Sequence, residues 1–267
     1  MRLRHLLVLL LFPILASAQP SGNPFTLQRA YELIDQGNPV LIEGYLKAWS
    51  AASPREIDLF VAKFNVDFQR SVDTGSDSLF AQALGHLNTA VGIQPRRLDL
   101  WLKTIFALNQ RGFHADQADL MRMLLDQSDR FGHEWLWEGD APLQESQAVF
   151  LMTMHDHLEQ WVGLPEPPVA QLRAVSERIS ASFPSDGASR AAVGLSHLLE
   201  GNPALGVPHL KRATELEPRN GSLWLMLAEG YEAMKDLAAA RSAYDRVMVL
   251  GNDEQKSVAA SKLERLR

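Results

Sequence analysis

The most informative part of the sequence is Trp224-x2-Leu227-Ala228-x2-Tyr231, together with Ala240-x3-Tyr244 shortly after it. The skeleton of this stretch is present once more, 34 residues earlier in the chain. The equivalent pairs are Pro184 and Pro218, Gly194 and Ala228, His197 and Tyr231, Leu210 and Tyr244, and Ala213 and Val247. Because the agreement covers both halves of each unit, the interval predicts a repeat built from two helices.

The pattern resembles the tetratricopeptide repeat, which reads W-x2-L-G-x2-Y, then A-x3-F, then a proline. The resemblance implies an all-α fold, a right-handed solenoid of stacked helix-turn-helix repeats that holds a partner protein or peptide. It covers two well-formed repeats, residues 187–220 and 221–254, and a degenerate one within residues 83–125. We expect at least four stacked antiparallel helix pairs, with Trp101 and Trp224 in corresponding places. In the degenerate repeat, Ile105 stands where the helix crossing needs a small residue.

Residues 1–18 have the pattern of a secretory signal peptide. A basic start precedes an apolar run over residues 6–15, and Ala16-Ser17-Ala18 matches a cleavage site. The run is shorter than the roughly twenty residues that span a bilayer as a helix, which argues against stable membrane insertion. We expect cleavage near Ala18 and a periplasmic or secreted product. The lack of cysteine favours the bacterial periplasm.

The remaining chain divides into four parts. We expect a disordered leader over residues 19–24, a helical region of degenerate hairpins over 25–182, two well-formed repeats over 183–254 and a capping helix over 255–267. Within the helical region, Ser53-Pro54 predicts the start of a third helix through Gln69, and the polar residues 71–78 predict a loop. The helical pattern is lost over residues 126–143, and no segment alternates as a β-strand does.

The composition excludes several classes of function. The formal net charge is −6, and the longest basic runs are Arg96-Arg97 and Lys211-Arg212, too short for the clustered cations that bind nucleic acid. The chain has no cysteine, which excludes disulfides and thiolate metal sites. The sequence also lacks a nucleophile elbow, a phosphate-binding glycine loop and an HExxH motif. We therefore predict a protein that is not an enzyme and uses no cofactor, and its oligomeric state stays open.

Two groups of residues are candidates for chemistry. Methionine and histidine together suit copper, and the group comprises Met121, Met123, Met152, Met154, His155 and His157. Residues two apart point to nearly opposite sides of a helix, so the local ligands split over two faces and a core stripe is the favoured interpretation. The charged residues between positions 133 and 140 lie beside Trp135 and Trp137. They form either an acid-base site or a loop that two buried tryptophans hold in place.

The resemblance also implies a groove lined by the first helix of each repeat. The candidate partner groove comprises Leu102, Lys103, Phe106, Leu195, Leu198, Leu225, Met226 and Glu229. These mostly apolar side chains either bind a partner or pack against neighbouring hairpins. We predict a periplasmic scaffold or adaptor for protein–protein interaction in cell-envelope assembly or regulation. The alternatives are a periplasmic antidote that binds a toxic effector, and a metal-handling protein or enzyme that uses residues 131–157.

Overall fold

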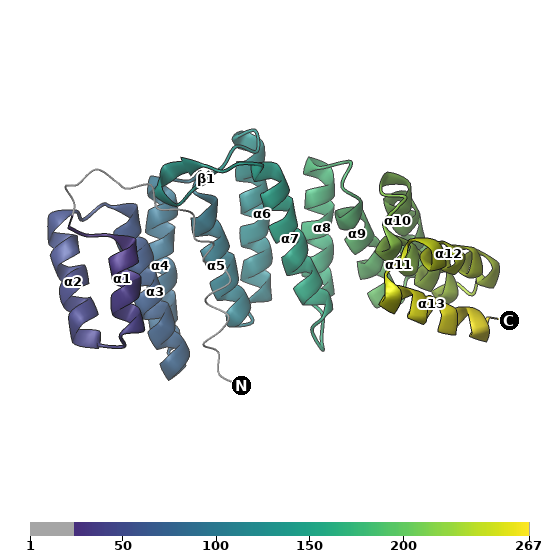
Figure 1. The fold of residues 1–267 in the computed structure, drawn as a ribbon, viewed down its shortest axis with the longest axis horizontal. Helices are drawn as coiled ribbons and strands as arrows, with labels where there is room; N and C mark the ends of the chain where they lie inside the picture. Colours follow the sequence, from purple (N-terminus) through teal and green to yellow (C-terminus); the bar gives the residue numbers. More distant parts are fainter. Residues whose placement is uncertain (1–23, 267) are drawn as a thin grey trace.

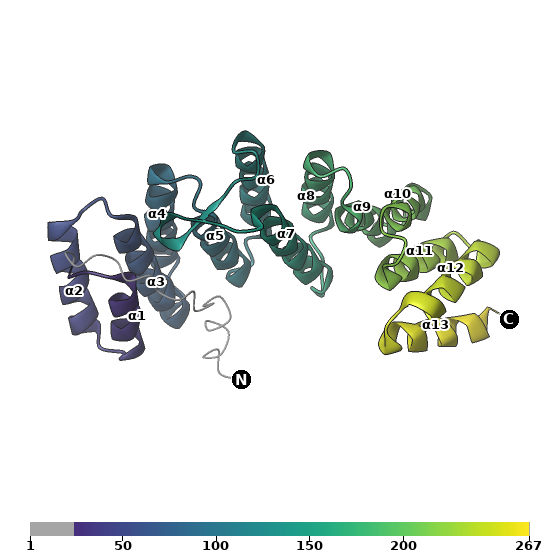
Figure 2. The ribbon, with the colours of Figure 1, turned by 45° about the horizontal axis from the view of Figure 1, so that its top comes forward.

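A computed structural model of the chain describes residues 24–266. The predicted signal peptide, residues 1–18, lies outside these residues, and so do residues 19–23 of the predicted leader. The described part contains thirteen α-helices stacked along the long axis of the molecule (Figure 1), and a turned view shows the same order (Figure 2). This stack confirms the predicted all-α solenoid. None of the described helices combines the length and apolar character needed to cross a membrane.

The first twelve helices form six hairpins, where the sequence predicts at least four. They are α1 (Leu27–Asp35) with α2 (Pro39–Ala52), α3 (Ile57–Thr74) with α4 (Asp77–Ile93), α5 (Leu98–Gln110) with α6 (His114–Arg130), α7 (Ser146–Val162) with α8 (Val169–Ser182), α9 (Gly187–Leu199) with α10 (Pro203–Leu216), and α11 (Gly221–Ala233) with α12 (Leu237–Leu250). The last helix, α13 (Asp253–Arg265), packs against α11 and α12.

The two C-terminal hairpins repeat with the interval seen in the sequence. α11 begins 34 residues after α9, at Gly221, and α12 begins 34 residues after α10, at Leu237. The indole N–H groups of Trp101 and Trp224 each donate to the carbonyl oxygen of a proline six residues earlier, at 2.9 and 3.0 Å. This shared contact confirms that the two tryptophans occupy corresponding places.

Small residues allow the two helices of each C-terminal hairpin to approach closely. A Cβ atom on Gly206 would lie 2.6 Å from the carbonyl oxygen of Gly194, so the α9–α10 crossing requires glycine. In the next hairpin the equivalent positions hold Ala228 and Ala240, and both are fully buried. Ile105 at the corresponding position of α5 is fully buried as well, so the degenerate hairpin accommodates the larger residue.

Replacing Ala228 with Leu is expected to destabilise the last hairpin. The larger side chain has to enter the buried contact between α11 and α12, and overpacking of this kind costs about 1–3 kcal/mol. Thermal unfolding measures the loss, and Ala233→Leu, at an exposed position of the same helix, is the matched control. If Ala228→Leu leaves the midpoint of thermal unfolding unchanged, Ala228 does not lie at the closest approach of α11 and α12.

The third helix begins later than Ser53-Pro54 predicts. Ser53 ends α2, residues 54–56 form a turn, and α3 begins at Ile57. The backbone N–H of Glu56 donates to the carbonyl oxygen of Ser53 at 3.2 Å, which closes this turn. The serine and proline therefore end one helix and do not open the next.

The loop predicted over residues 71–78 is also wrong, because only residues 75–76 lie between α3 and α4. Gly75 has a φ of 70°, a left-handed conformation that glycine adopts without strain and that ends a helix. The polar residues before it stay helical, and the hydroxyl of Ser71 donates to the carbonyl oxygen of Phe68. The polar residues expected to form a loop are therefore the last turn of α3.

An insertion of residues 131–145 separates α6 from α7. Within it, β1 (Leu136–Trp137) and β2 (Ala141–Pro142) pair as an antiparallel hairpin around a 3-10 turn, Glu138–Asp140. The expectation of no strand is therefore wrong at this point, because strands of two residues are too short to show an alternating pattern. We call residues 136–142 the brace.

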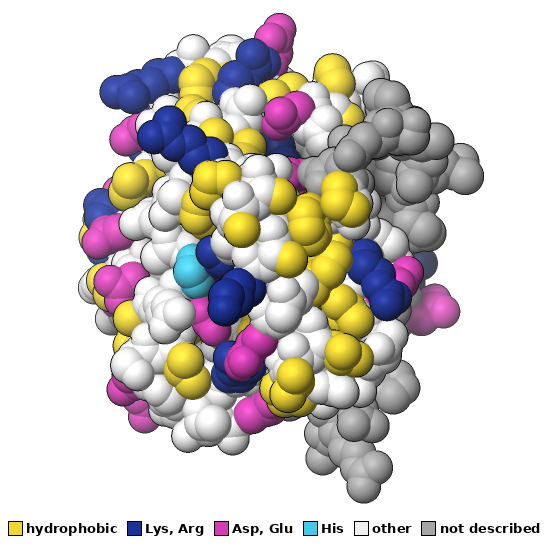
Figure 3. Space-filling view, turned by 90° about the vertical axis from the view of Figure 1, so that its left-hand side faces the viewer, with side chains coloured by type: hydrophobic (Ala, Val, Ile, Leu, Met, Phe, Trp, Pro, Cys, Tyr) yellow, Lys and Arg dark blue, Asp and Glu magenta, His cyan; other side chains and the backbone are white. Residues whose placement is uncertain are grey.

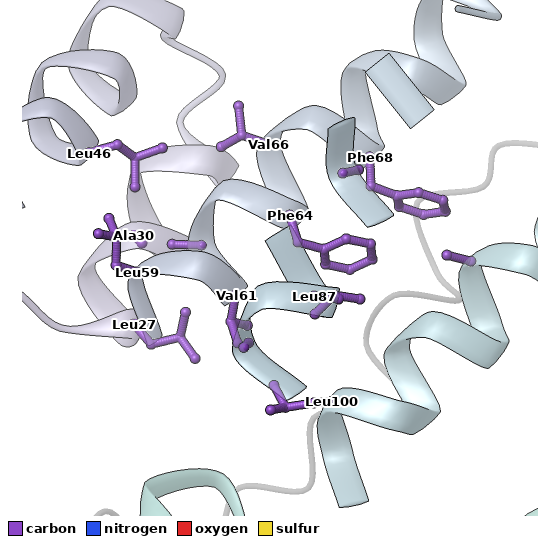
Figure 4. Packing of buried hydrophobic residues seen from close by; sticks show 14 of the residues in the cluster. Leu27, Ala30, Leu46, Leu59, Val61, Phe64, Val66, Phe68, Leu87 and Leu100 are labelled. Carbon is purple, nitrogen blue, oxygen red and sulfur yellow. The ribbon is translucent and has the colours of Figure 1, made fainter. Parts of the chain in front are cut away.

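Apolar side chains form four successive clusters along the stack. The first joins helices α1 to α5, and Figure 4 shows Leu27, Leu59, Phe64 and Leu87 within it. The other three clusters follow along the chain toward α13. Each cluster lies between neighbouring helices of the described part, as expected for a solenoid whose repeats contact only their neighbours.

Candidate interaction groove

Three predicted groove residues occupy the same position in three different hairpins. When Trp101 is aligned with Trp224, Phe106 of α5 corresponds to Glu229 of α11. The 34-residue interval makes Leu195 of α9 the counterpart of Glu229. We call these three residues the groove row, because they occupy the equivalent position of three hairpins; the α7–α8 hairpin lies between the first and the second of them.

The other predicted groove residues differ in how much surface they offer. Leu102 is only 7% exposed and packs in the second apolar cluster, so it contributes no surface. The half-buried members of the predicted set are Lys103, Phe106, Leu195, Leu198, Leu225 and Met226. Glu229 is exposed. A half-buried apolar side chain keeps a part that faces solvent, so these residues retain a surface for a partner.

Several of these side chains also pack inside the protein. Phe106 meets Phe68 of α3 edge-on, with 6.4 Å between the ring centroids. Leu198 lies against Gly206 of α10. Leu225 and Met226 pack against the last two apolar clusters, whereas Leu195 belongs to none of the four. Leu195 is therefore the position where a change tests the surface with the least effect on packing.

Glu232 makes a charged contact that the sequence analysis missed. It accepts hydrogen bonds from Nζ of Lys262 at 2.8 Å and from the hydroxyl of Tyr244 at 2.5 Å. Burial acts to raise the pKa of Glu232, but these two hydrogen bonds hold it below its usual value. The ionised carboxylate ties α11 to α12 and α13, which fixes the C-terminal end of the groove row. No local spacing signals this contact, because Lys262 lies 30 residues away in sequence.

The aromatic segment that the sequence offers as an alternative site is held within the fold. Trp135 is buried, stacks on Phe150 with 6.0 Å between the ring centroids, and donates to the hydroxyl of Ser128. The backbone N–H of Leu136 donates to the carbonyl oxygen of Arg96 at 2.9 Å. These contacts attach the insertion to α6, α7 and the start of α5.

A buried arginine lies beneath the brace. Arg97 is 2% exposed, and its Nε and Nη2 atoms donate to the two carboxylate oxygens of Asp99, each at 2.8 Å. Asp58 of α3 and Asp140 of the brace lie 3.7 and 3.9 Å from its Nη1 atom. In the sequence Arg97 is only part of a short basic run, and no motif links it to carboxylates on three different segments.

The candidate metal ligands lie in different environments. Met121 and Met154 are fully buried in the apolar core, whereas Met123 and Met152 are exposed. His155 is instead bonded through Nε2 to the carboxylate that caps α9, at 2.9 Å. Within residues 24–266, no three His, Cys, Asp or Glu side chains are grouped as metal ligands.

His157 takes part in a buried polar contact between α6 and α7. Burial lowers its pKa to about 4, so the imidazole is neutral near pH 7. Its Nδ1 atom lies 3.5 Å from the side-chain nitrogen of Gln117. The Gln117 oxygen accepts a hydrogen bond from the indole of Trp161 at 2.9 Å. The arrangement links two hairpins through neutral groups.

A second apolar surface lies at the α1–α2 end of the stack. Figure 3 shows hydrophobic side chains gathered over this end. Val40 and Leu41 of α2 are 76% and 50% exposed. At the opposite end, α13 carries a capping box formed by Asn252 and Gln255, and its outer positions are mostly polar.

The 34-residue offset, the paired tryptophan contacts and the close helix crossings define an α-solenoid with a tetratricopeptide-like fold. Among solved structures the chain is similar to TTC0263, a thermophilic TPR protein of Thermus thermophilus. That comparison has 16% identity and a TM-score of 0.42, and covers 75% of this chain and 99% of the other.

Two further solved structures are similar to a comparable degree. YrrB, a TPR protein with an unusual peptide-binding site, has 14% identity and a TM-score of 0.46 over 82% of this chain and 98% of its own. PilW, a type IV pilus biogenesis factor, has 11% identity and a TM-score of 0.43 over 87% and 96%. No protein-family model matches the sequence, and no curated protein does.

Proposed function

We propose that this chain is an interaction scaffold or adaptor that binds another protein along the groove row. The observation that carries the proposal is the partial exposure of Phe106 and Leu195 at the same position of different repeats. Repeated positions on a solenoid make an extended binding surface, and exposed apolar side chains favour contact with a partner. The row ends at the exposed carboxylate of Glu229. A fitting partner therefore presents apolar side chains followed by a basic group.

The proposed place of action is the bacterial periplasm, in cell-envelope assembly or regulation. The signal-peptide pattern of residues 1–18 and the absence of cysteine support this assignment. Protein recovered from the periplasm should begin at Gln19. A full-length chain found only in the cytosol would contradict export. The proposal that the groove row binds a partner does not depend on export.

Leu195→Ser is expected to weaken partner binding roughly tenfold, because an apolar anchor in an interface contributes more than about 1 kcal/mol. Capture by the wild-type protein from periplasmic extract identifies the partner, and titration with that purified partner then gives a Kd for each variant.

The matched control is Leu205→Ser, which changes a residue that is 58% exposed on α10 and lies outside the groove row. This variant should bind as the wild-type protein does. Thermal unfolding establishes that both variants are folded. Equal affinities for two folded variants would exclude the groove row as the binding surface.

A further inference from the structure

The brace connects parts of the chain that are distant in sequence. It hydrogen-bonds to Arg96 through the N–H of Leu136, and Asp140 at its turn approaches the Arg97 guanidinium. Figure 1 shows β1 along the upper edge of the stack, above α5. The negative charge of Glu138, also in the brace, acts on Tyr31 of α1 and on Asp58 of α3. The brace therefore faces three different hairpins.

Carboxylates outnumber cations at this junction. Asp99 takes two hydrogen bonds from Arg97, which leaves Asp58 and Asp140 beyond hydrogen-bonding distance at 3.7 and 3.9 Å. The Oδ1 atom of Asp58 is buried and has no hydrogen-bond partner. A buried charge in this position is unfavourable, and removing the charge relieves the cost.

The titratable and charged groups that act on Asp58 come from four segments. They are Tyr31 of α1, Glu56 in the turn before α3, Arg97 and Asp99 at the start of α5, and Glu138 of the brace, while Asp140 of the brace lies near the same Arg97 guanidinium. Most of these charges are negative, and the brace supplies two of them. Docking the brace therefore adds negative charge beside a half-buried carboxylate.

We propose that the brace is a proton-linked latch: a proton on Asp58 fastens the brace onto the start of α5, and loss of that proton loosens it. The latch depends on the junction around Arg97 and is independent of the groove row. It would let the ambient acidity change how firmly the first three hairpins are held together.

The acid–base properties of Asp58 support this assignment. Burial, with the charges of Glu138 and Asp99, raises the pKa of Asp58 to about 6 against the opposing effect of Arg97. Undocking removes the charge of Glu138, which raises this pKa in addition to burial, so the pKa of Asp58 falls. The docked state therefore binds the proton more tightly, and by linkage the proton strengthens docking. Docking strengthens as the pH falls through 6 and weakens as the pH rises above it.

Hydrogen exchange at the Leu136 amide measures docking directly, because that N–H is bonded to Arg96 only when the brace is in place. A pKa that falls by one unit on undocking, from about 6, makes the protection factor roughly fivefold higher at pH 5 than at pH 8. Asp58→Asn imitates the protonated carboxyl and should keep protection high at both values. Wild-type protection that does not change between pH 5 and pH 8 would overturn the proposal.

Two further variants keep the test decisive. Histidines also titrate between pH 5 and pH 8. The quantity to compare is therefore the slope of the Leu136 protection factor against pH, in the wild type and in each variant. Asp67→Asn replaces a buried carboxylate on the same helix as Asp58 and should leave the wild-type slope intact. Glu138→Gln changes an exposed residue and should reduce the slope even if Asp58→Asn does not fold. A wild-type slope in Glu138→Gln and in folded Asp58→Asn would show that the latch does not exist.

Discussion

Replacing Arg97 with Met is expected to destabilise the hairpins that meet at the start of α5 by about 3–5 kcal/mol. Arg97 and Asp99 are almost completely buried and share two hydrogen bonds of 2.8 Å. Removing the guanidinium leaves the Asp99 carboxylate buried without its partner, which costs more than the ion pair itself contributes. Urea unfolding followed by tryptophan fluorescence measures the loss.

The double variant Arg97→Met with Asp99→Leu separates the cost of the orphaned charge from the loss of packing. Replacing both members of a buried ion pair with apolar residues of similar size is often neutral, so the double variant should recover most of the loss. A single variant that loses less than about 1 kcal/mol, the range of exposed pairs, would mean that water reaches this junction.

Acidification is expected to destabilise the wild-type protein through His157 by about 3 kcal/mol. The folded-state pKa of His157 is about 4 and the ordinary value is 6.5, so the unfolded chain binds more protons between these limits. The contribution is absent above pH 6.5, grows as the pH falls and is complete below pH 4. The cause is burial, which disfavours the charged imidazole.

His157→Gln removes the titrating group and keeps a polar side chain beside Gln117. The difference in unfolding free energy between wild type and variant should change by about 3 kcal/mol between pH 7.5 and pH 4, to the disadvantage of the wild type. Asp58 shifts in the opposite sense but is present in both proteins, so its contribution cancels. A difference that stays constant over this range would mean that His157 is protonated in the folded protein without cost.

The repeat architecture follows from the sequence because its signal is local and periodic. Tyr244 and Val247 recur as apolar positions at the predicted interval, and both are fully buried. The ends of helices are harder to predict where the same residue types occur both at helix ends and at helix starts or in loops. Ser53-Pro54 has the composition of a helix start, yet the serine ends the preceding helix. The polar residues 71–74 resemble a loop, yet they complete α3.

The charged contacts of Glu232 and of Arg97 could not be predicted, because no motif or regular spacing in the sequence relates the residues that meet there. Glu232 meets Lys262 across the α11–α13 contact, and Asp140 approaches Arg97 only because the brace folds back. The groove row shows a further limit. The interval specifies which positions are equivalent, but exposure depends on neighbours from other hairpins, so Leu102 is buried and Leu195 is not. The binding role of the row stays a prediction.

The brace also has a consequence for cooperativity. In a stack whose hairpins contact only their neighbours, the hairpin at either end can unfold alone. The free energy of that step depends on the single interface that it loses. The brace adds contacts between residues about forty positions apart and places its charges against α1 and α3. The first three hairpins should therefore open as a single unit, whereas α9 to α13 fray one hairpin at a time. The N-terminal hairpins should then unfold more cooperatively than the C-terminal ones.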